Sequence, residues 1–416
     1  MSYGVRERLL ETDQPGLLAA IAVALLLLAP LLLPPFQTSL LAETLIFAIF
    51  ATAFNLLYGY TGLLSFGHAM FVAVAGYSVA KFIQVIAPGL GFPELFGGAS
   101  VLVTFVGAVI LGVLMATLLA VFVGYLSVQL EEIYFAMITL SFSMAIFAIA
   151  NQDTVGSVLE AIGVGGGTFT NGSDGLTFLL GEVNLFGLEF TLVNIRDPTA
   201  YYLIVVLVFV VAMYGLWRVV NSPFGMICRA IRENPGRAEA LGIDVTHHSW
   251  MTFIISGAFS GLAGALLIPL FTNVNPDYAY WTFSAQPVLM TVIGGAYAFL
   301  GPLAGAFTYE YLRWFITQFP TLEAHWQFFF GSMILAVVLF FPNGVAGGFD
   351  WVRTRLADQG IGTAADTGAG TEIGTDAETG TGTGTETGTD AAAGIETTGE
   401  DAGTDVDADT EAGDDD

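Results

Sequence analysis

The stretch ASVLVTFVGAVILGVLMATLLAVFVG, residues Ala99–Gly124, decides the fold, because all of its 26 residues are uncharged. A helix needs about 20 apolar residues to cross the hydrocarbon core of a bilayer. Two further stretches, Gly16–Leu33 and Tyr201–Trp217, are equally free of charge. Apolar residues make up 55% of the chain, and its mean hydropathy is +0.72. These features predict an integral membrane protein rather than a soluble protein with a buried helix.

Hydropathy along the chain predicts an all-α, polytopic bundle of about ten transmembrane helices. The predicted spans are residues 16–33, 39–57, 63–86, 99–123, 132–150, 200–218, 249–270, 284–300, 302–317 and 326–342. The region 284–317 is interrupted by Leu300-Gly301-Pro302, so it fits either a broken pair of short helices or one long tilted helix. The first run follows Arg6 and Arg8 like a signal peptide, but prolines follow it instead of a cleavage pattern, which indicates a retained span.

The distribution of arginine predicts the orientation. Ten spans with a cytoplasmic N-terminus, residues 1–15, place eight of the eleven basic residues inside, whereas nine spans would put Arg353 and Arg355 outside. We therefore expect a transmembrane domain over 16–345 in the cell membrane, with both termini cytoplasmic. This domain would have an external loop at 151–198 and a cytoplasmic loop at 219–248. The external loop holds Asn171-Gly172-Ser173, which fits an N-glycosylation acceptor.

The acidic charge is concentrated at the C-terminus. Of the net charge of −26, residues 357–416 contribute 17 acidic residues and no Lys or Arg, in loose repeats such as TGTGTETGTD. Such a composition buries too little apolar surface to order itself, so we expect the end of the 346–416 segment to be disordered. Solvated filler is favoured over a docking tail for a basic partner. Because Lys81 is the sole lysine and acids are in excess, we also expect a haloarchaeal, high-salt cytoplasm.

The sequence lacks the residue patterns of catalysis. Cys228 is the sole cysteine, which excludes an internal disulfide and a cysteine-based metal site. Lys81 lies in Tyr-Ser-Val-Ala-Lys rather than after a glycine-rich turn, so the chain has no P-loop for ATP. The spans contain few ionisable candidates (Glu43, His68 and Glu310), which disfavours an ion-coupled transporter without excluding it. We predict no catalytic residue, no metal ligand and no cofactor bound by this chain, and no nucleic-acid partner.

The loop 219–248 is predicted to form two short amphipathic helices. Met226–Glu233 has helical spacing, and Pro235 at a helix start precedes a second segment through Leu241 that Gly242 ends. Both segments carry arginine on one side and apolar residues on the other. From spacing alone, docking in a partner's groove and lying on lipid headgroups are equally good interpretations.

Four motifs in order resemble the branched-chain amino acid ABC transporter permeases of bacteria and archaea. The family pattern S-x-x-G-x-x-x-x-A-I-R-x-x-x-x-x-A-x-x-x-G is filled by Ser222, Gly225, Ala230, Ile231, Arg232, Ala238 and Gly242, and is followed by Gly261, Gly264, Ala265 and Leu266. The segment from Asn55 to Ala69 matches N-L-x-x-G-x-x-G-x-x-S-x-G-H, and Gly165–Leu176 resembles the family's external G-G-x-x-G-L loop. The pair Gly294-Gly295 with Gly301-Pro302 and Gly305-Ala306 matches the fourth pattern. Together the motifs cover roughly residues 39–345.

The resemblance implies a non-catalytic pore subunit. It would pair with a second permease subunit, two ATP-binding cassette subunits that bind the ATP and Mg, and an extracellular substrate-binding protein. The long N-terminal region looks like the longer, M-type permease of the family. Branched-chain amino acids are the implied substrate, with urea or short amides as the alternative within the family.

The resemblance also assigns roles to residues. In the loop, Gly225–Gly242 would be the coupling helix that docks on the ATPase, and the residues we select there are Gly225, Arg229, Ala230, Arg232, Arg237, Glu239 and Gly242. Candidates for the pathway or for helix breaks are Asn55, Gly59, Gly62, Ser65, Gly67, His68, Gly294, Gly295, Gly301 and Pro302. The glycines would permit close helix contact or break helices. Ser65 and His68 would face the pathway, or His68 would hydrogen-bond a neighbouring helix.

Overall fold

A computed structural model describes residues 15–130, 132–161, 168–178, 182–185, 188–191, 198–319, 325–340 and 344. All of them belong to one compact unit, residues 1–360. The expectations that concern Arg6, Arg8, Arg353, Arg355 and the acidic tail lie outside the described residues. In the glycine-rich part of the 151–198 loop, residues Gly163–Gly167 also lie outside them, whereas Asn171–Gly175 are described.

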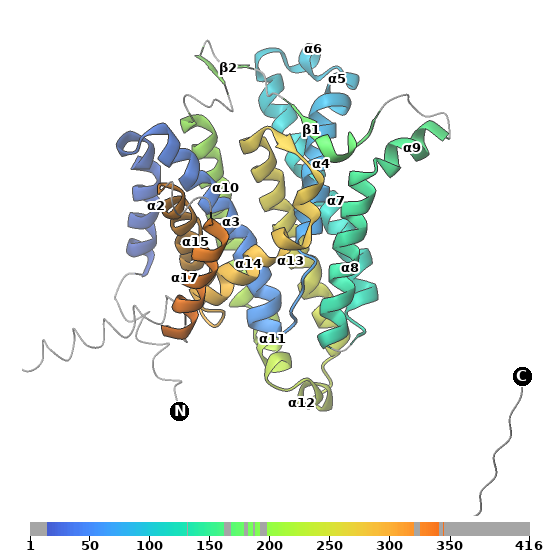
Figure 1. The fold of residues 1–416 in the computed structure, drawn as a ribbon, viewed down its shortest axis with the longest axis vertical. Helices are drawn as coiled ribbons and strands as arrows, with labels where there is room; N and C mark the ends of the chain where they lie inside the picture. The colour runs from blue at the N-terminus through green and yellow to red at the C-terminus, as the bar shows by residue number, and fades with distance from the viewer. Residues whose placement is uncertain are drawn as a thin grey trace, which may run out of the picture. The chain divides into compact units, whose positions relative to one another are not determined.

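The described chain is almost entirely helical (Figure 1). Ten principal helices make up the bundle within the described ranges: α2 (Pro15–Leu32), α3 (Pro35–Thr61), α4 (Ala69–Lys81), α7 (Ser100–Ser127), α8 (Glu132–Asn151), α10 (Thr199–Val220), α13 (Val245–Phe271), α14 (Trp281–Gly294), α15 (Gly301–Thr317) and α17 (Trp326–Phe340). Six segments among the described residues are long and apolar enough to cross a membrane. This confirms an all-α, multi-pass membrane protein, while the total of ten crossings stays a prediction.

Short elements connect the principal helices. These are a π-helical turn (Phe82–Ile86), α5 (Ala87–Gly89), α6 (Phe92–Phe96), α9 (Thr154–Ala161), α11 (Pro223–Glu233), α12 (Pro235–Ala240), three 3-10 turns (Gly97–Ala99, Gly172–Asp174 and Pro276–Ala279) and the strands β1 (Leu176–Thr177), β2 (Glu182–Leu185), β3 (Leu188–Thr191) and β4 (Asn273–Val274). Both strand pairs are antiparallel, β1 with β4 and β2 with β3, and Leu176 lies opposite Val274. The helices α11 and α12 lie at the end of the bundle opposite β1 and β2 (Figure 1).

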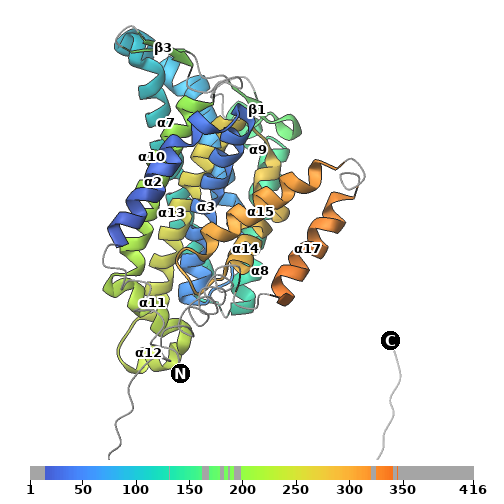
Figure 2. The same cartoon turned by 90° about the vertical axis from the view of Figure 1, so that its left-hand side faces the viewer.

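Helix α3 is the centre of the bundle (Figure 2). It is buried on nearly all sides, and 94% of its most hydrophobic window is buried inside the bundle, where it packs against α10, α13, α14 and α15. The outer helices α7 and α8 are buried over only 28% and 22% of their windows and expose large apolar side chains such as Ile110 and Ile133. These exposed faces suit contact with lipid or with another subunit.

Two long helices are each followed by a connection to a further helix. Helix α3, of 27 residues, ends beside α11, and a non-helical segment, the first break (Gly62–His68), leads to α4, which continues through the π-helical turn and α5 to Gly89. Helix α13, also of 27 residues, begins beside α12 and runs away from it, and the connection Thr272–Tyr280, with β4 and a 3-10 turn, leads to α14, of 14 residues. The two long helices therefore run in opposite directions. Helices α4 and α14 meet where the Ala69 amide donates to Ser284 Oγ at 3.0 Å.

Two predicted span boundaries are wrong because the helix is interrupted there. The predicted span 63–86 starts inside the first break, where Gly62 ends α3 at a φ of +89°, a conformation that L side chains rarely adopt. In the predicted span 284–300 the helix ends at Gly294, and the second break, Gly295–Leu300, follows it, because Gly295 has a φ of +103°. Residues 284–317 thus form a broken pair, α14 and α15, and not one long helix.

Candidate functional site

The loop between α10 and α13 holds the two predicted short helices. Helix α11 begins at Ser222-Pro223, three residues before the expected start, because proline suits the first turn of a helix. Helix α12 is capped by the Asn234 side chain, which accepts from the Arg237 amide at 2.8 Å, and Gly242 with a φ of +85° follows it.

This loop has an inner and an outer face. Cys228, Ile231 and Ala238 are buried against the bundle. The side chains of Met226 and Leu241 are 60% and 77% exposed, respectively. Ala230, Arg237 and Glu239 are exposed as well. The loop therefore presents a mixed apolar and charged face at the end of the bundle.

Two of the predicted docking arginines have partners within the chain. Arg232 donates from Nη1 to the carbonyl of Gly59 in the last turn of α3, and its guanidinium lies 4.2 Å from the centre of the Tyr297 ring. Arg229 donates to the carbonyl of Val220 at 2.9 Å, at the end of α10. Carbonyls at helix C-termini lack helical partners and attract cations. These arginines therefore join the loop to the ends of the principal helices.

The first break places a histidine in the core. His68 is fully buried, and its Nε2 lies 2.9 Å from Ser256 Oγ on α13. The Ser256 hydroxyl donates its one proton to the Ala53 carbonyl at 2.6 Å, so His68 Nε2 is the donor to Ser256. Nδ1 has no hydrogen-bond partner within the described part of the chain, and the ring packs edge-on against Phe54 and Phe71. The structure thus places His68 against a neighbouring helix.

The other polar residues of the first motif are buried nearby. Ser65 accepts from the amide of Gly67 at 3.3 Å. Asn55 is fully buried beside Gly59, and neither atom of its amide group has a hydrogen-bond partner among the described residues. A Cβ on Gly67 would overlap the Thr139 carbonyl, so this glycine brings the break against α8.

An apolar cavity of about 470 Å³ opens between this break and α8. It is lined by alternate residues of the break and by one face of the helix: Gly62, Leu64, Phe66, Ile133, Ala136, Met137 and Leu140. The lining residues of the break are two positions apart, as one face of an extended backbone requires, and those of α8 are three or four positions apart along one helix face.

Helices α14 and α15, on either side of the second break (Gly295–Leu300), contact each other through their backbones. A Cβ on Gly294 would overlap the Gly301 carbonyl, and a Cβ on Gly305 would overlap the Met290 carbonyl. Pro302 lies in the first turn of α15, where its missing amide proton costs nothing. The glycines therefore do both things that the spacing allowed: they break helices at Gly62 and Gly295 and permit close contact elsewhere.

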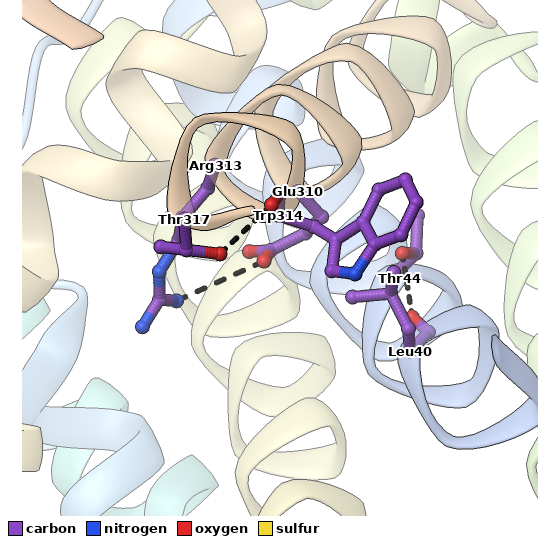
Figure 3. Close-up of polar contacts among 6 residues, drawn as sticks. All are labelled: Leu40, Thr44, Glu310, Arg313, Trp314 and Thr317. Atoms are coloured by element: carbon purple, nitrogen blue, oxygen red, sulfur yellow. Dashed lines mark hydrogen bonds and ion pairs between the residues drawn. The ribbon is translucent and has the colours of Figure 1, made fainter. Parts of the chain in front are cut away.

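A charged cluster lies on α15, and Figure 3 shows its residues Glu310 and Arg313 across the helix contact from Thr44 of α3. Glu310 is 2% exposed, and its Oε2 lies 3.8 Å from Nη1 of Arg313, which is 44% exposed. Glu43 on α3 is near enough for its charge to act on Glu310. Sequence reasoning selected Glu43 and Glu310 but missed Arg313, although opposite charges three residues apart in a helix signal a pair.

The described residues contain no group of three or more His, Cys, Asp or Glu side chains that could hold a metal ion. Residues 36–338 match the protein family described as branched-chain amino acid transport system / permease component. The chain belongs to this permease family. Its fold and family show a multi-pass membrane protein that is a permease component of an ABC-type transporter.

The relatives include both permease types. The permease is 25% identical over 337 residues to the probable branched-chain amino acid transport permease protein LivM of Methanocaldococcus jannaschii, covering 72% of this chain and 90% of the relative. It is 24% identical to the high-affinity LivM permease of Escherichia coli K12, over 78% of this chain and 73% of the relative. It is also 28% identical to the M. jannaschii LivH permease, over 40% of this chain and 54% of that protein. No solved structure matches.

These likenesses identify a Liv-type permease, as the motifs predicted. Because similarity extends to LivM and to LivH, the family implies a transporter of several subunits with a second permease. The similarity to LivM covers more of the chain, in agreement with the longer permease type. The haloarchaeal origin stays a prediction.

Proposed function

We propose that the permease is the non-catalytic pore subunit of an ATP-driven importer for branched-chain amino acids. The observation that carries this proposal is the outer face of α11 and α12, which presents Met226, Arg237, Glu239 and Leu241 at one end of the bundle. A short amphipathic surface of this kind suits a groove in a partner protein. The names of the relatives support branched-chain amino acids as the substrate.

In this proposal, two ATP-binding subunits bind the ATP and Mg and dock beneath α11 and α12. That end of the bundle and both termini are then cytoplasmic. The opposite end, with β1 and β2, receives an external substrate-binding protein. The second permease subunit completes the pathway, so this chain supplies half of it.

The internal contacts of Arg229 and Arg232 refine the docking surface. Both guanidinium groups contact carbonyls of the bundle, whereas Arg237 and Glu239 are exposed. We therefore assign direct polar docking to Arg237 and Glu239. Arg229 and Arg232 hold the loop on the bundle, so that movement of the ATPases reaches α3 and α10.

Co-purification tests the proposal. ATP-binding subunits should purify with the tagged permease, and Arg237→Ala with Glu239→Ala should reduce their recovery. Arg218→Ala, an exposed arginine on α10 outside the loop, is the matched control.

Proteoliposomes of the assembled complex, with the binding protein, should take up leucine when ATP is supplied, and uptake should survive uncouplers. Uptake that collapses with an ion gradient and ignores ATP would instead indicate a secondary transporter. Titration of the binding protein with leucine, isoleucine, valine and urea separates branched-chain amino acids from urea.

A further inference from the structure

Charge is rare within the bundle, and it is concentrated in one place. In the described principal helices, three charged side chains lie more than one turn from a helix end: Glu43, Glu310 and Arg313. All three belong to the cluster that α3 and α15 form together. Charged side chains inside a membrane are costly, and they face a water-filled path or other protein rather than lipid.

The charges of this cluster do not balance. Helices α3 and α15 pack together, and Glu43 is near enough for its charge to act on Glu310 and to be acted on by Arg313. Arg313 lies 3.8 Å from Glu310, near the limit for an ion pair. Glu310 Oε1 is buried and has no hydrogen-bond partner within the described ranges. Figure 3 shows Arg313 extending from α15 toward the side of Glu310 away from Trp314 and Thr44. A buried carboxylate oxygen without a donor is expensive, so the site is incomplete as it stands.

The cluster lies a short way below the end of the bundle that is opposite the loop. Helix α15 begins after Tyr297, which contacts Arg232, and runs away from α11. Glu310 precedes Thr317 by seven residues, and Glu43 follows Pro35 by eight, which places both carboxylates about 10–12 Å from the helix ends. In the proposed orientation this is the external mouth of the permease.

We propose that Glu310, Glu43 and Arg313 form a subsite for the ammonium and carboxylate groups of a zwitterionic amino acid. This inference rests on the proposed function and names the chemical groups that the site recognises. The carboxylates of Glu310 and Glu43 accept from the ammonium group, and the half-exposed Arg313 donates to the substrate carboxylate. Oε1 of Glu310, which has no hydrogen-bond partner among the described residues, is the acceptor for the ammonium group, and Arg313, which is 44% exposed, is the group that the substrate carboxylate meets first.

Two probes each carry one of the two charged groups of leucine. Isopentylamine has the side chain and ammonium of leucine without the carboxylate, and 4-methylpentanoate has the carboxylate without the ammonium. Binding of radiolabelled leucine to the purified complex in lipid nanodiscs, without the binding protein, gives the affinity of this site alone. Each probe is then tested as a competitor.

We expect Glu310→Gln to weaken leucine and isopentylamine about tenfold or more and to leave 4-methylpentanoate unchanged, because a charge-assisted hydrogen bond is lost. Arg313→Gln should show the reverse selectivity. Glu160→Gln, an exposed acid on α9, is the matched control and should bind like the wild type. If Glu310→Gln fails to assemble, Glu43→Gln decides, because Glu43 is partly exposed and should weaken the same two ligands.

Two results overturn the proposal. One is a complex that binds leucine and keeps its wild-type affinity for leucine under Glu310→Gln, Glu43→Gln and Arg313→Gln. The other is an equal loss for both competitors, which indicates a structural ion pair. Failure of the proposed function would show separately, as wild-type permease that purifies without ATP-binding subunits or takes up no amino acid with ATP.

Discussion

The guanidinium of Arg232 on α11 donates a hydrogen bond to the backbone carbonyl of Gly59 on α3. The same guanidinium lies over Tyr297, in the turn between α14 and α15. One side chain thus connects the loop with the helix before the first break and with the second break, Gly295–Leu300, between α14 and α15. Movement of the loop is therefore transmitted to both breaks through Arg232.

We expect Arg232→Ala to lower leucine uptake per ATP hydrolysed while the ATP-binding subunits still co-purify. The substitution removes the contact with α3 and leaves the exposed docking face in place. Arg232→Lys keeps the charge but not the planar geometry over Tyr297, so it should restore coupling in part. The measurement is uptake and ATP hydrolysis in the same proteoliposomes. Loss of the ATP-binding subunits from Arg232→Ala would show instead that Arg232 docks on them directly.

Gly305→Ala should destabilise the hairpin of α14 and α15. The new methyl group would overlap the Met290 carbonyl, which belongs to a backbone that cannot rotate away. Overpacking of this kind costs about 1–3 kcal/mol of unfolding free energy. Gly331→Ala on α17 is the control, because a Cβ there meets no atom within 4 Å. Thermal unfolding in detergent compares the two, and equal midpoints would contradict the close contact.

His68 and Ser256 should show coupled stability in a double-mutant cycle. His68→Leu removes the donor to Ser256, and Ser256→Ala removes both the acceptor and the donor to Ala53. We expect the double mutant to be less destabilised than the sum of the single mutants by about 1 kcal/mol. Unfolding by denaturant in detergent gives the four free energies. Strict additivity would show that the hydrogen bond contributes nothing.

Asp153, just beyond α8, holds the segment that contains Thr170. Its carboxylate accepts from the amides of Phe169 and Thr170 and from the Thr170 hydroxyl, at 2.7–3.0 Å. Burial raises the pKa of the Asp153 carboxyl, but hydrogen bonds from Thr170 and Phe169 outweigh it and lower the pKa below its ordinary value. The stabilisation is therefore complete above the unfolded pKa of about 3.9 and is lost as the pH falls through the folded pKa.

Hydrogen exchange measures how firmly Asp153 holds the amides of Phe169 and Thr170. At pH 7, Asp153→Asn should lower the protection of the Phe169 and Thr170 amides, after correction for intrinsic rates. In the wild type, the same protection should fall below about pH 4. Asp174→Asn, which changes a neighbouring exposed acid, should leave it unchanged. Wild-type protection that is constant down to pH 2 would contradict the role of the carboxylate.

Hydropathy predicted the principal helices, because each is a long apolar run. It missed the break at Gly62–His68, since an unwound backbone within protein can be as apolar as a helix. The residues that end the helices, Gly62 and Gly295, were in the predicted motifs, but spacing alone did not separate breaking from packing. Positive φ values made that distinction.

The site was predicted unevenly for a related reason. Pro235 and Gly242 mark helix ends locally, so the two loop helices followed from the sequence. The direction of Arg232 depends on Gly59 and Tyr297, which are distant in the chain, and amphipathic spacing does not say which groove a face enters. The approach of Glu43 to Glu310 likewise joins two separate helices, and no local pattern records it.

The half-length helix α14 also constrains how the chain enters the membrane. It has 14 residues and is about 21 Å long, shorter than the hydrocarbon core of about 30 Å. It cannot partition into the bilayer on its own, since its non-helical neighbour would leave backbone groups in lipid. During synthesis, α14 must wait for α13, so the unit of insertion is the long helix together with its short companion.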